Sequence, residues 1–266
     1  ENVAIGHGAL DAATTANGNT AVGTDTMGGA LTGDNNTAVG YNAMLVATSV
    51  TGTTAIGNQC LDALTTGDNN TAVGSAALGA NTTASNNVAV GKGALAANTT
   101  GTDNVAVGYL ALDAQTTGGY NVAVGRDAGG AITTGEKNVI VGSAAADGMT
   151  TSDQCTVVGY GALSAATGAD NNTAVGYLAL AANTTGSDNA AVGKQAMPVN
   201  TTGESNTVVG STALTVNTTG SFNTVMGRSA LGLNTTGNHN VAIGRNALAA
   251  NITSSNNVAV GQSSLT

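Results

Sequence analysis

The chain has 266 residues, 15 of them acidic and 6 basic, which leaves a formal net charge of −9. It contains 39 glycines, a single phenylalanine and no tryptophan. The acidic charge argues against a nucleic-acid partner, which would leave a basic footprint. No apolar run approaches the roughly 20 residues of a membrane-spanning helix. The many valines and threonines argue against a disordered chain, because disordered segments are poor in β-branched residues.

One glycine recurs every 17 residues along the whole chain, without an insertion or a deletion. We number the positions of the repeat relative to this repeat glycine. Position −1 is valine or isoleucine except at Met226, and position −4 is asparagine except at Thr53 and Cys155. The consensus is N-[TV]-A-V-G-x-x-A-L-x-x-N-T-T-G-x-x. The repeat glycines are Gly6, Gly23, Gly40, Gly57, Gly74, Gly91, Gly108, Gly125, Gly142, Gly159, Gly176, Gly193, Gly210, Gly227, Gly244 and Gly261.

A repeat of 17 residues is too short for a helix pair and suits one coil of a β-solenoid, with two short strands and two turns. The residues at positions −3 to −1 are typical of a strand. The repeat glycine and the Thr-Thr-Gly corner suit turns that need positive φ or close backbone approach. The sequence therefore predicts an all-β fold, a parallel β-solenoid of sixteen coils. We expect residues 1–266 to form a single solenoid segment without caps, as part of a longer fibre.

The expected first strand is apolar on both faces. Positions −3 and −1 point to one side and position −2, usually alanine, points to the other. A strand that is apolar on both faces is usually buried on both. One coil has a single interior, so we expect the second face to meet another chain. The alternative is a flattened coil whose apolar stripe faces water.

The asparagine at position −4 is expected to form a ladder along the stack, as stacked asparagines do in cross-β assemblies. A second asparagine, at position +7, creates the N-x-[ST] glycosylation pattern. The repeat consensus itself generates this pattern, so we interpret it as structural. We expect the structural ladder to include Asn87, Asn104, Asn121 and Asn172, and the repeat glycines Gly91, Gly108, Gly125 and Gly176 that follow them.

Position +1 varies most in chemistry and is expected to form an exposed ridge, because it accepts tyrosine, arginine and serine alike. Five of the six basic residues and four of the five tyrosines stand there. Tyrosine and arginine dominate recognition hot spots, so the ridge is a candidate surface for a sugar or a protein. The plainer interpretation is that these side chains only cover the coil edge. The ridge residues singled out are Tyr41, Lys92, Tyr109, Arg126, Tyr160, Tyr177, Lys194, Arg228 and Arg245.

Acidic residues collect in the two positions before the ladder asparagine, at an acidic corner. Calcium could bind there through oxygen ligands, but aspartate and asparagine are also ordinary turn residues. We therefore expect no cofactor, with calcium at this corner as the alternative. No catalytic cluster, metal-ligand spacing or phosphate loop is present, so we expect no enzyme. The acidic corner comprises Asp34, Asp68, Asp103, Glu136, Asp153, Asp170, Asp188 and Glu204.

The two cysteines, Cys60 and Cys155, stand where the repeat has alanine and asparagine. They lie six coils apart in the expected stack, or about 28 Å at 4.7–4.9 Å per coil. A disulfide needs Cα atoms within about 7 Å. We interpret both cysteines as small buried substitutes that do not pair with each other.

The repeat resembles two families of surface proteins. Asn172-Thr-Ala-Val-Gly-Tyr-Leu-Ala-Leu180, followed by Asn183-Thr-Thr-Gly186, is similar to the repeats of phage tail-fibre-like proteins. The N-[TV]-A-V-G-x-x-A core also resembles the head repeats of trimeric autotransporter adhesins. This resemblance implies a parallel β-roll with three chains side by side, and a role in attachment or as a fibre shaft.

The expected function is therefore a structural and adhesive shaft or head segment of an extracellular homotrimeric fibre, at a cell surface or on a virion. The expected partner is the chain itself, as a trimer or an end-to-end filament, with a host surface glycan or protein as a further candidate. The alternative is an ice-binding or glycan-binding solenoid that acts through a regular surface ladder. A polysaccharide-cleaving fibre would need two carboxylates about 5–9.5 Å apart in a groove.

Overall fold

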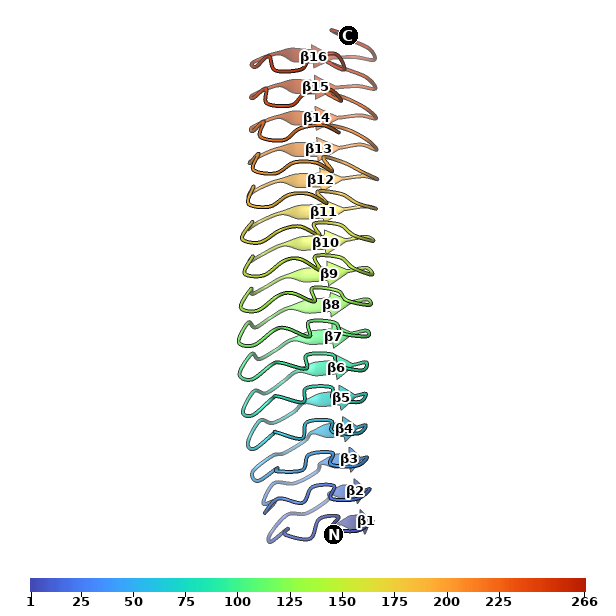
Figure 1. The fold of residues 1–266 in the computed structure, drawn as a ribbon, viewed down its shortest axis with the longest axis vertical. Coiled ribbons are helices and arrows are strands. Elements are labelled where there is room, and N and C mark those ends of the chain that lie inside the picture. The colour runs from blue at the N-terminus through green and yellow to red at the C-terminus, as the bar shows by residue number, and fades with distance from the viewer. The chain divides into compact units, whose positions relative to one another are not determined.

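The computed structural model describes residues 1–266 and contains sixteen three-residue strands and no helix. The chain divides into two compact units, Glu1–Gly135 and Glu136–Thr266, with eight strands each. Each unit is a parallel β-solenoid with one strand per coil (Figure 1), so the predicted fold class is confirmed. The strands of the first unit are β1 (Val3–Ile5), β2 (Thr20–Val22), β3 (Thr37–Val39), β4 (Thr54–Ile56), β5 (Thr71–Val73), β6 (Val88–Val90), β7 (Val105–Val107) and β8 (Val122–Val124). Those of the second unit are β9 (Val139–Val141), β10 (Thr156–Val158), β11 (Thr173–Val175), β12 (Ala190–Val192), β13 (Thr207–Val209), β14 (Thr224–Met226), β15 (Val241–Ile243) and β16 (Val258–Val260).

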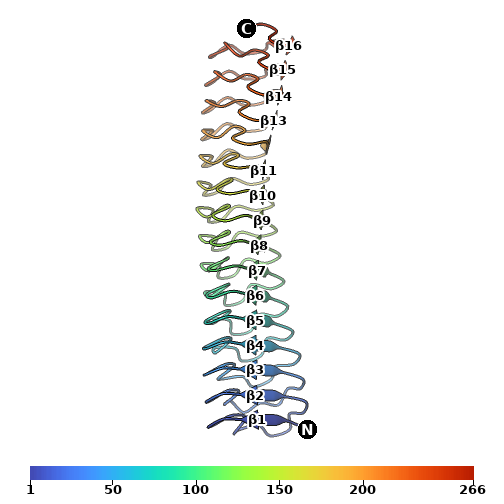
Figure 2. The same cartoon turned by 90° about the vertical axis from the view of Figure 1, so that its right-hand side faces the viewer.

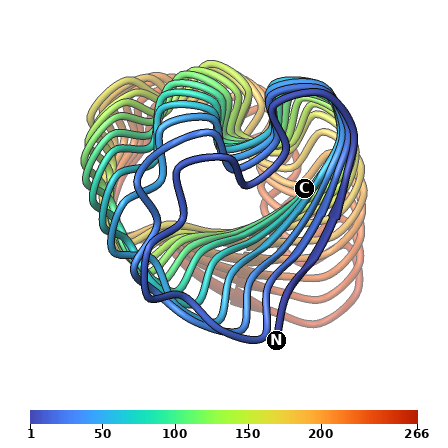
Figure 3. The ribbon, with the colours of Figure 1, turned by 90° about the horizontal axis from the view of Figure 1, so that it is seen from below.

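The register within each unit follows the 17-residue period. Val88 of β6 lies beside Val105 of β7, and Thr156 of β10 lies beside Thr173 of β11. Identical positions of successive coils therefore form columns that run along each unit, and Figure 2 shows the strands of each unit following one another along one side of the coils. Seen along the stack in Figure 3, the blue to green coils of the first unit repeat one outline.

The prediction of two strands per coil is wrong, because the second half of the coil is a continuous turn. Residues at positions +2 and +4 have positive φ although few of them are glycine, for example Leu110 at 51° and Leu112 at 51°. The side chains of the consecutive residues Ala111 and Leu112 are both fully buried. In a strand these two side chains would point to opposite faces. The left-handed residues instead turn both side chains into the same interior.

The interior of the coil is narrow, which explains the composition. Alanine at positions −2 and +3 and leucine or methionine at position +4 fill it, and most of these side chains have no exposed surface. Ala106 of β7, for instance, is fully buried. An aromatic ring has no room in such an interior, so the single phenylalanine, Phe222, lies on the surface with 48% of its area exposed.

The asparagine ladder at position −4 is present, and it supplies hydrogen-bond partners to backbone groups as well as to side chains. The backbone N–H of Asn104 donates to Oδ1 of Asn87 in the preceding coil, at 3.0 Å. The Nδ2 of Asn104 donates to the carbonyl oxygen of Gly118 at 3.0 Å, which ties the strand to the Thr-Thr-Gly corner. Buried backbone groups need such partners, because an unpaired one costs about 1–3 kcal/mol.

Position +7 carries a second, separate ladder. Nδ2 of Asn217 donates to Oδ1 of Asn200 at 3.0 Å, and Nδ2 of Asn234 donates to Oδ1 of Asn217 at 3.0 Å. These side chains have no exposed surface. The N-x-[ST] pattern at these positions is therefore structural, since the amide nitrogen that glycosylation would need is buried and hydrogen-bonded. The asparagines that carry the pattern and are fully buried are Asn81, Asn98, Asn183, Asn200, Asn217 and Asn234.

One substitution at position +7 leaves a buried acceptor unpaired and leads to a testable prediction. Gln115 stands where the consensus has asparagine, and its Nε2 donates to the carbonyl oxygen of Gly118 at 2.5 Å. Oδ1 of Asn98 in the preceding coil is left buried without a hydrogen-bond partner. Replacing Gln115 by asparagine should restore the missing bond and stabilise the chain by about 1 kcal/mol. Urea denaturation of Q115N against wild type measures this gain, and an unchanged midpoint would contradict it.

Candidate functional surfaces

The outward face of the strands forms an apolar stripe in each unit. Position −2 is buried under the strand, whereas position −1 is partly exposed, with Val124 at 38% in the first unit and Val209 at 37% in the second. Threonine or valine at position −3 lies beside it on the same face. We call positions −3 and −1 of each unit its outward stripe. The stripe gives each unit a flat apolar surface that repeats with every coil.

The ridge at position +1 is exposed, as expected for a position that accepts such different side chains. The four tyrosines singled out there have about half of their surface exposed, and the five basic residues are also exposed. Tyr160 and Tyr177 stack on each other, with ring centroids 5.7 Å apart and planes 13° apart. One face of each ring therefore covers the other ring, whereas about half of each tyrosine remains exposed. The two faces that meet are closed to a sugar, and the contact leaves the two outer faces uncovered.

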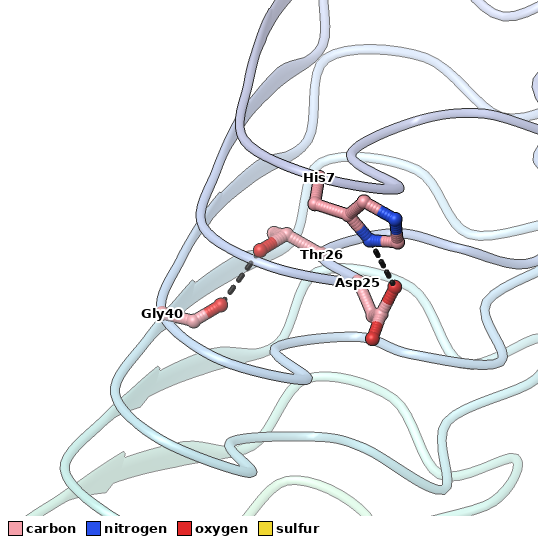
Figure 4. Close-up of polar contacts among 4 residues, drawn as sticks. All are labelled: His7, Asp25, Thr26 and Gly40. Carbon is pink, nitrogen blue, oxygen red and sulfur yellow. Dashed lines mark hydrogen bonds and ion pairs between the residues drawn. The ribbon is translucent and has the colours of Figure 1, made fainter.

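Side-chain contacts with aspartate occupy the ridge of the first unit at two places. Nδ1 of His7 lies 3.7 Å from Oδ1 of Asp25 in the next coil, as Figure 4 shows. Nε of Arg126 donates to Oδ2 of Asp127 at 2.7 Å. Both aspartates stand at position +2, directly after the ridge.

The coil that carries Asp25 also shows how a polar residue is accommodated inside. Thr26 replaces the usual alanine at position +3 and has no exposed surface. Its Oγ1 donates to the carbonyl oxygen of Gly40 in the next coil at 2.6 Å (Figure 4). The buried hydroxyl is thereby satisfied, so Thr26 needs no ligand to explain it.

The acidic corner has a structural explanation. Oδ1 of Asp68 accepts the backbone N–H of Thr51 in the preceding coil at 2.8 Å, and Oδ1 of Asp153 accepts that of Glu136 at 2.7 Å. Where a later coil has a different residue at the same position, its side chain does the same, as Oγ of Ser221 does for Glu204 at 3.0 Å. No three histidine, cysteine, aspartate or glutamate side chains gather closely enough to hold a metal ion. Calcium at this corner stays a prediction.

A second acidic column, at position +5, was not singled out from the sequence. Asp62 and Asp113 stand there, and burial raises the pKa of both carboxyls above the usual aspartate value. The charge of nearby Asp127 raises the pKa of Asp113 further. The signal that could have revealed the column is the recurrence of aspartate five residues after the repeat glycine, at Asp11, Asp62, Asp113 and Asp147.

Both cysteines are buried and free, as the sequence indicated. Sγ of Cys60 donates to the carbonyl oxygen of Ala72, and Sγ of Cys155 to that of Ala169, each at 3.3 Å. Burial raises the pKa of the Cys60 thiol to about 12 and that of the Cys155 thiol to about 11. Both thiols are protonated at neutral pH, so neither is a reactive nucleophile.

The Thr-Thr pair at positions +8 and +9 presents one exposed column. The hydroxyl of the first threonine is used by the fold, as Oγ1 of Thr201 donates to the carbonyl oxygen of Thr218 at 2.9 Å. The second threonine, for example Thr202, is exposed. A flat ice-binding face needs two outward threonines per coil, and the pair supplies one. The ice-binding alternative stays a prediction.

The surfaces of the second unit include a shallow groove of about 400 Å³, which no motif of the repeat predicts. It lies over positions +2, +5 and +6 of the coils around Gly232, which are variable positions of the repeat. The structure contains no helix that could cross a membrane. No protein-family model and no curated protein matches the chain.

Proposed function

We propose that the chain is a structural and adhesive segment of an extracellular homotrimeric fibre, at a cell surface or on a virion. The outward stripe is the single observation that carries this proposal. It combines partly exposed valine or isoleucine at position −1, except at Met226, with threonine or valine at position −3, except at Ala190, along each unit. Contiguous apolar surface of this kind is typical of an interaction face rather than of a surface in contact with water.

The period of the stripe favours another copy of this chain as its partner. A partner must match an apolar column that repeats once per coil, and a second copy has the same coil spacing by construction. Backbone pairing sets that spacing at about 4.7–4.9 Å in every copy. The number three comes from the resemblance to adhesin heads and tail-fibre-like repeats. The ridge at position +1 and the groove lie at other positions of the coil. In the proposed trimer they stay accessible and can serve adhesion.

The test is the mass of the protein in solution, measured by light scattering at several concentrations. We expect three times the 25.4 kDa of one chain. Replacing Val192 and Val209 by lysine puts two charges into the stripe of neighbouring coils, where a chain interface would have to bury them. This double variant should have the mass of a single chain.

The matched control is Ser211→Lys, which adds a charge at the exposed ridge next to the same strand. It should keep the wild-type mass. Far-ultraviolet circular dichroism of all three proteins checks that the coils still form. A wild-type protein that stays a monomer at every concentration would refute the proposal, and so would a double variant that still forms the wild-type assembly.

A further inference from the structure

The groove of the second unit is built at variable positions of the repeat. Gly232 at position +5 has no side chain, whereas Leu233 at position +6 replaces the usual alanine. Leu233 stands as an apolar wall with 52% of its surface exposed, and Val216 of the preceding coil lies beside it. The groove volume of about 400 Å³ is in the range of small-ligand sites, which are about 300–1,000 Å³.

The opposite edge of the groove carries polar groups in a row, one per coil. They are the hydroxyls of Thr212 and Ser229 and the amide of Asn246, all at position +2. The two hydroxyls lie 3.1 Å apart and hydrogen-bond to each other. The side chain of Asn246 makes no hydrogen bond within the chain, so both its donor and its acceptor are available to a ligand.

Two arginines adjoin this polar row. Arg228 and Arg245 directly precede Ser229 and Asn246, are exposed, and form no ion pair. Arg126 at the same position of the first unit has Asp127 beside it, but Arg228 and Arg245 are followed by serine and asparagine. All fifteen acidic residues of the chain lie before residue 205, and residues 205–266 carry only these two formal charges. An otherwise acidic chain therefore has a local cationic surface next to the groove.

We propose that this groove binds a carboxylated oligosaccharide that lies along the coils. Sugars present an apolar face of C–H groups and an edge of hydroxyls, which match the Leu233 wall and the row from Thr212 to Asn246. Arginine pairs with carboxylates through two parallel hydrogen bonds. The arginines recur at the coil spacing of about 4.7–4.9 Å, which is similar to the spacing of successive rings in a glycan chain. One acidic sugar per coil would place a carboxylate at each arginine.

This inference gives the adhesive part of the proposed function a ligand class and rests on it, but it does not need a trimer. The groove uses positions +2, +5 and +6, whereas the outward stripe uses positions −3 and −1. Binding and solution mass can therefore be measured separately. Loss of the trimer with binding intact would refute only the assembly, and a trimer that does not bind would refute only this inference.

The experiment titrates the full chain by isothermal calorimetry with three acidic probes and with neutral counterparts of two of them. The acidic probes are oligogalacturonate, oligoalginate and a sialylated oligosaccharide. The neutral probes are oligogalacturonate with its carboxylates reduced and the same oligosaccharide without its sialic acid. We expect an acidic probe to bind and its neutral counterpart to bind at least about tenfold more weakly, the effect of one charge-assisted contact.

The variants use residues that the chain itself has at the same positions, so the coils should still form. Gly232→Asp introduces aspartate, which the chain already has at position +5 in Asp62. The new side chain adds bulk and a negative charge to the groove and should abolish binding. Arg228→Ser and Arg245→Gln introduce the residues that Ser211 and Gln262 supply at the same position of neighbouring coils. Each variant should weaken binding about tenfold. Arg126→Ser removes the same charge from the first unit and should leave binding unchanged.

Three results would overturn the inference. The first is that no acidic probe binds at millimolar concentration, and the second is that Gly232→Asp binds as wild type does. The third is that Arg126→Ser weakens binding as much as Arg228→Ser, which would mean a general charge effect. A change of solution mass in Arg228→Ser or Arg245→Gln would point instead to an acidic surface of another copy as the partner of these arginines.

Discussion

Replacing Gly176 by alanine should destabilise the second unit by about 4 kcal/mol or more, among the largest effects of a single methyl group. Gly176 has a φ of 135°, a region that residues with a Cβ rarely adopt and that costs them about 1–3 kcal/mol. A Cβ at this position would also lie 2.5 Å from the carbonyl oxygen and 2.6 Å from the carbonyl carbon of Gly193 in the next coil. These are backbone atoms directly after β12, where the N–H of Gly193 donates to the carbonyl oxygen of Val175 at 2.8 Å and its carbonyl oxygen accepts the N–H of Ala196 at 3.2 Å, so they have little freedom to move aside.

The chain offers a control that separates the two costs. Gly261 has a similar φ of 125°, but a Cβ there would meet no atom within 4 Å. Gly261→Ala should therefore show only the backbone cost of about 1–3 kcal/mol. Urea denaturation followed by circular dichroism compares the two variants with wild type. Equal losses at Gly176 and Gly261 would mean that φ alone requires glycine and that the close approach of the coils does not.

The features that were predictable from the sequence are those that recur in every repeat. The 17-residue period places β6 and β7 in register, and the alternation of Val88, Ala89 and Val90 puts the alanine on the opposite face from the two valines, although it does not indicate which face is inside. The exposure of position +1 followed from its variety of side chains. These inferences depend on averages over sixteen copies, so a local exception does not disturb them.

The positive φ angles at positions +2 and +4 were not predictable, because leucine and alanine give no local signal for this backbone conformation. Leu112 adopts 51° because this conformation buries its side chain beside Ala111, and burial outweighs the backbone preference. The groove was missed for the opposite reason. It depends on the particular residues at variable positions, such as Gly232 and Leu233, and their joint effect appears only when neighbouring coils are stacked.

The ladder at position −4 should be the second most sensitive feature, and Asn206→Ala tests it. Asn206 is fully buried, and its Oδ1 accepts the backbone N–H of Asn223 in the next coil at 3.0 Å. Its Nδ2 donates to the carbonyl oxygen of Gly220 at 2.9 Å, a carbonyl that also accepts from Asn217. Alanine would leave the buried N–H of Asn223 without an acceptor and open a small cavity. We expect a loss of about 3 kcal/mol in the free energy of unfolding.

Asn206→Thr is the matched control, because the chain already uses threonine at this position of another coil. Oγ1 of Thr53 accepts the backbone N–H of Asn70 at 3.2 Å, and Thr53 is fully buried. Threonine at position 206 should therefore keep the acceptor for the backbone N–H of Asn223. It should lose the three Nδ2 bonds, to Oδ1 of Asn189 and to the carbonyl oxygens of Glu204 and Gly220, but each of these acceptors keeps another donor. We expect about half of the alanine effect, since an unsatisfied buried donor costs more than lost bonds at acceptors that keep another donor. If urea denaturation shows equal losses for alanine and threonine, the ladder stabilises the stack through packing of the amide and not through the acceptor it offers to the next coil.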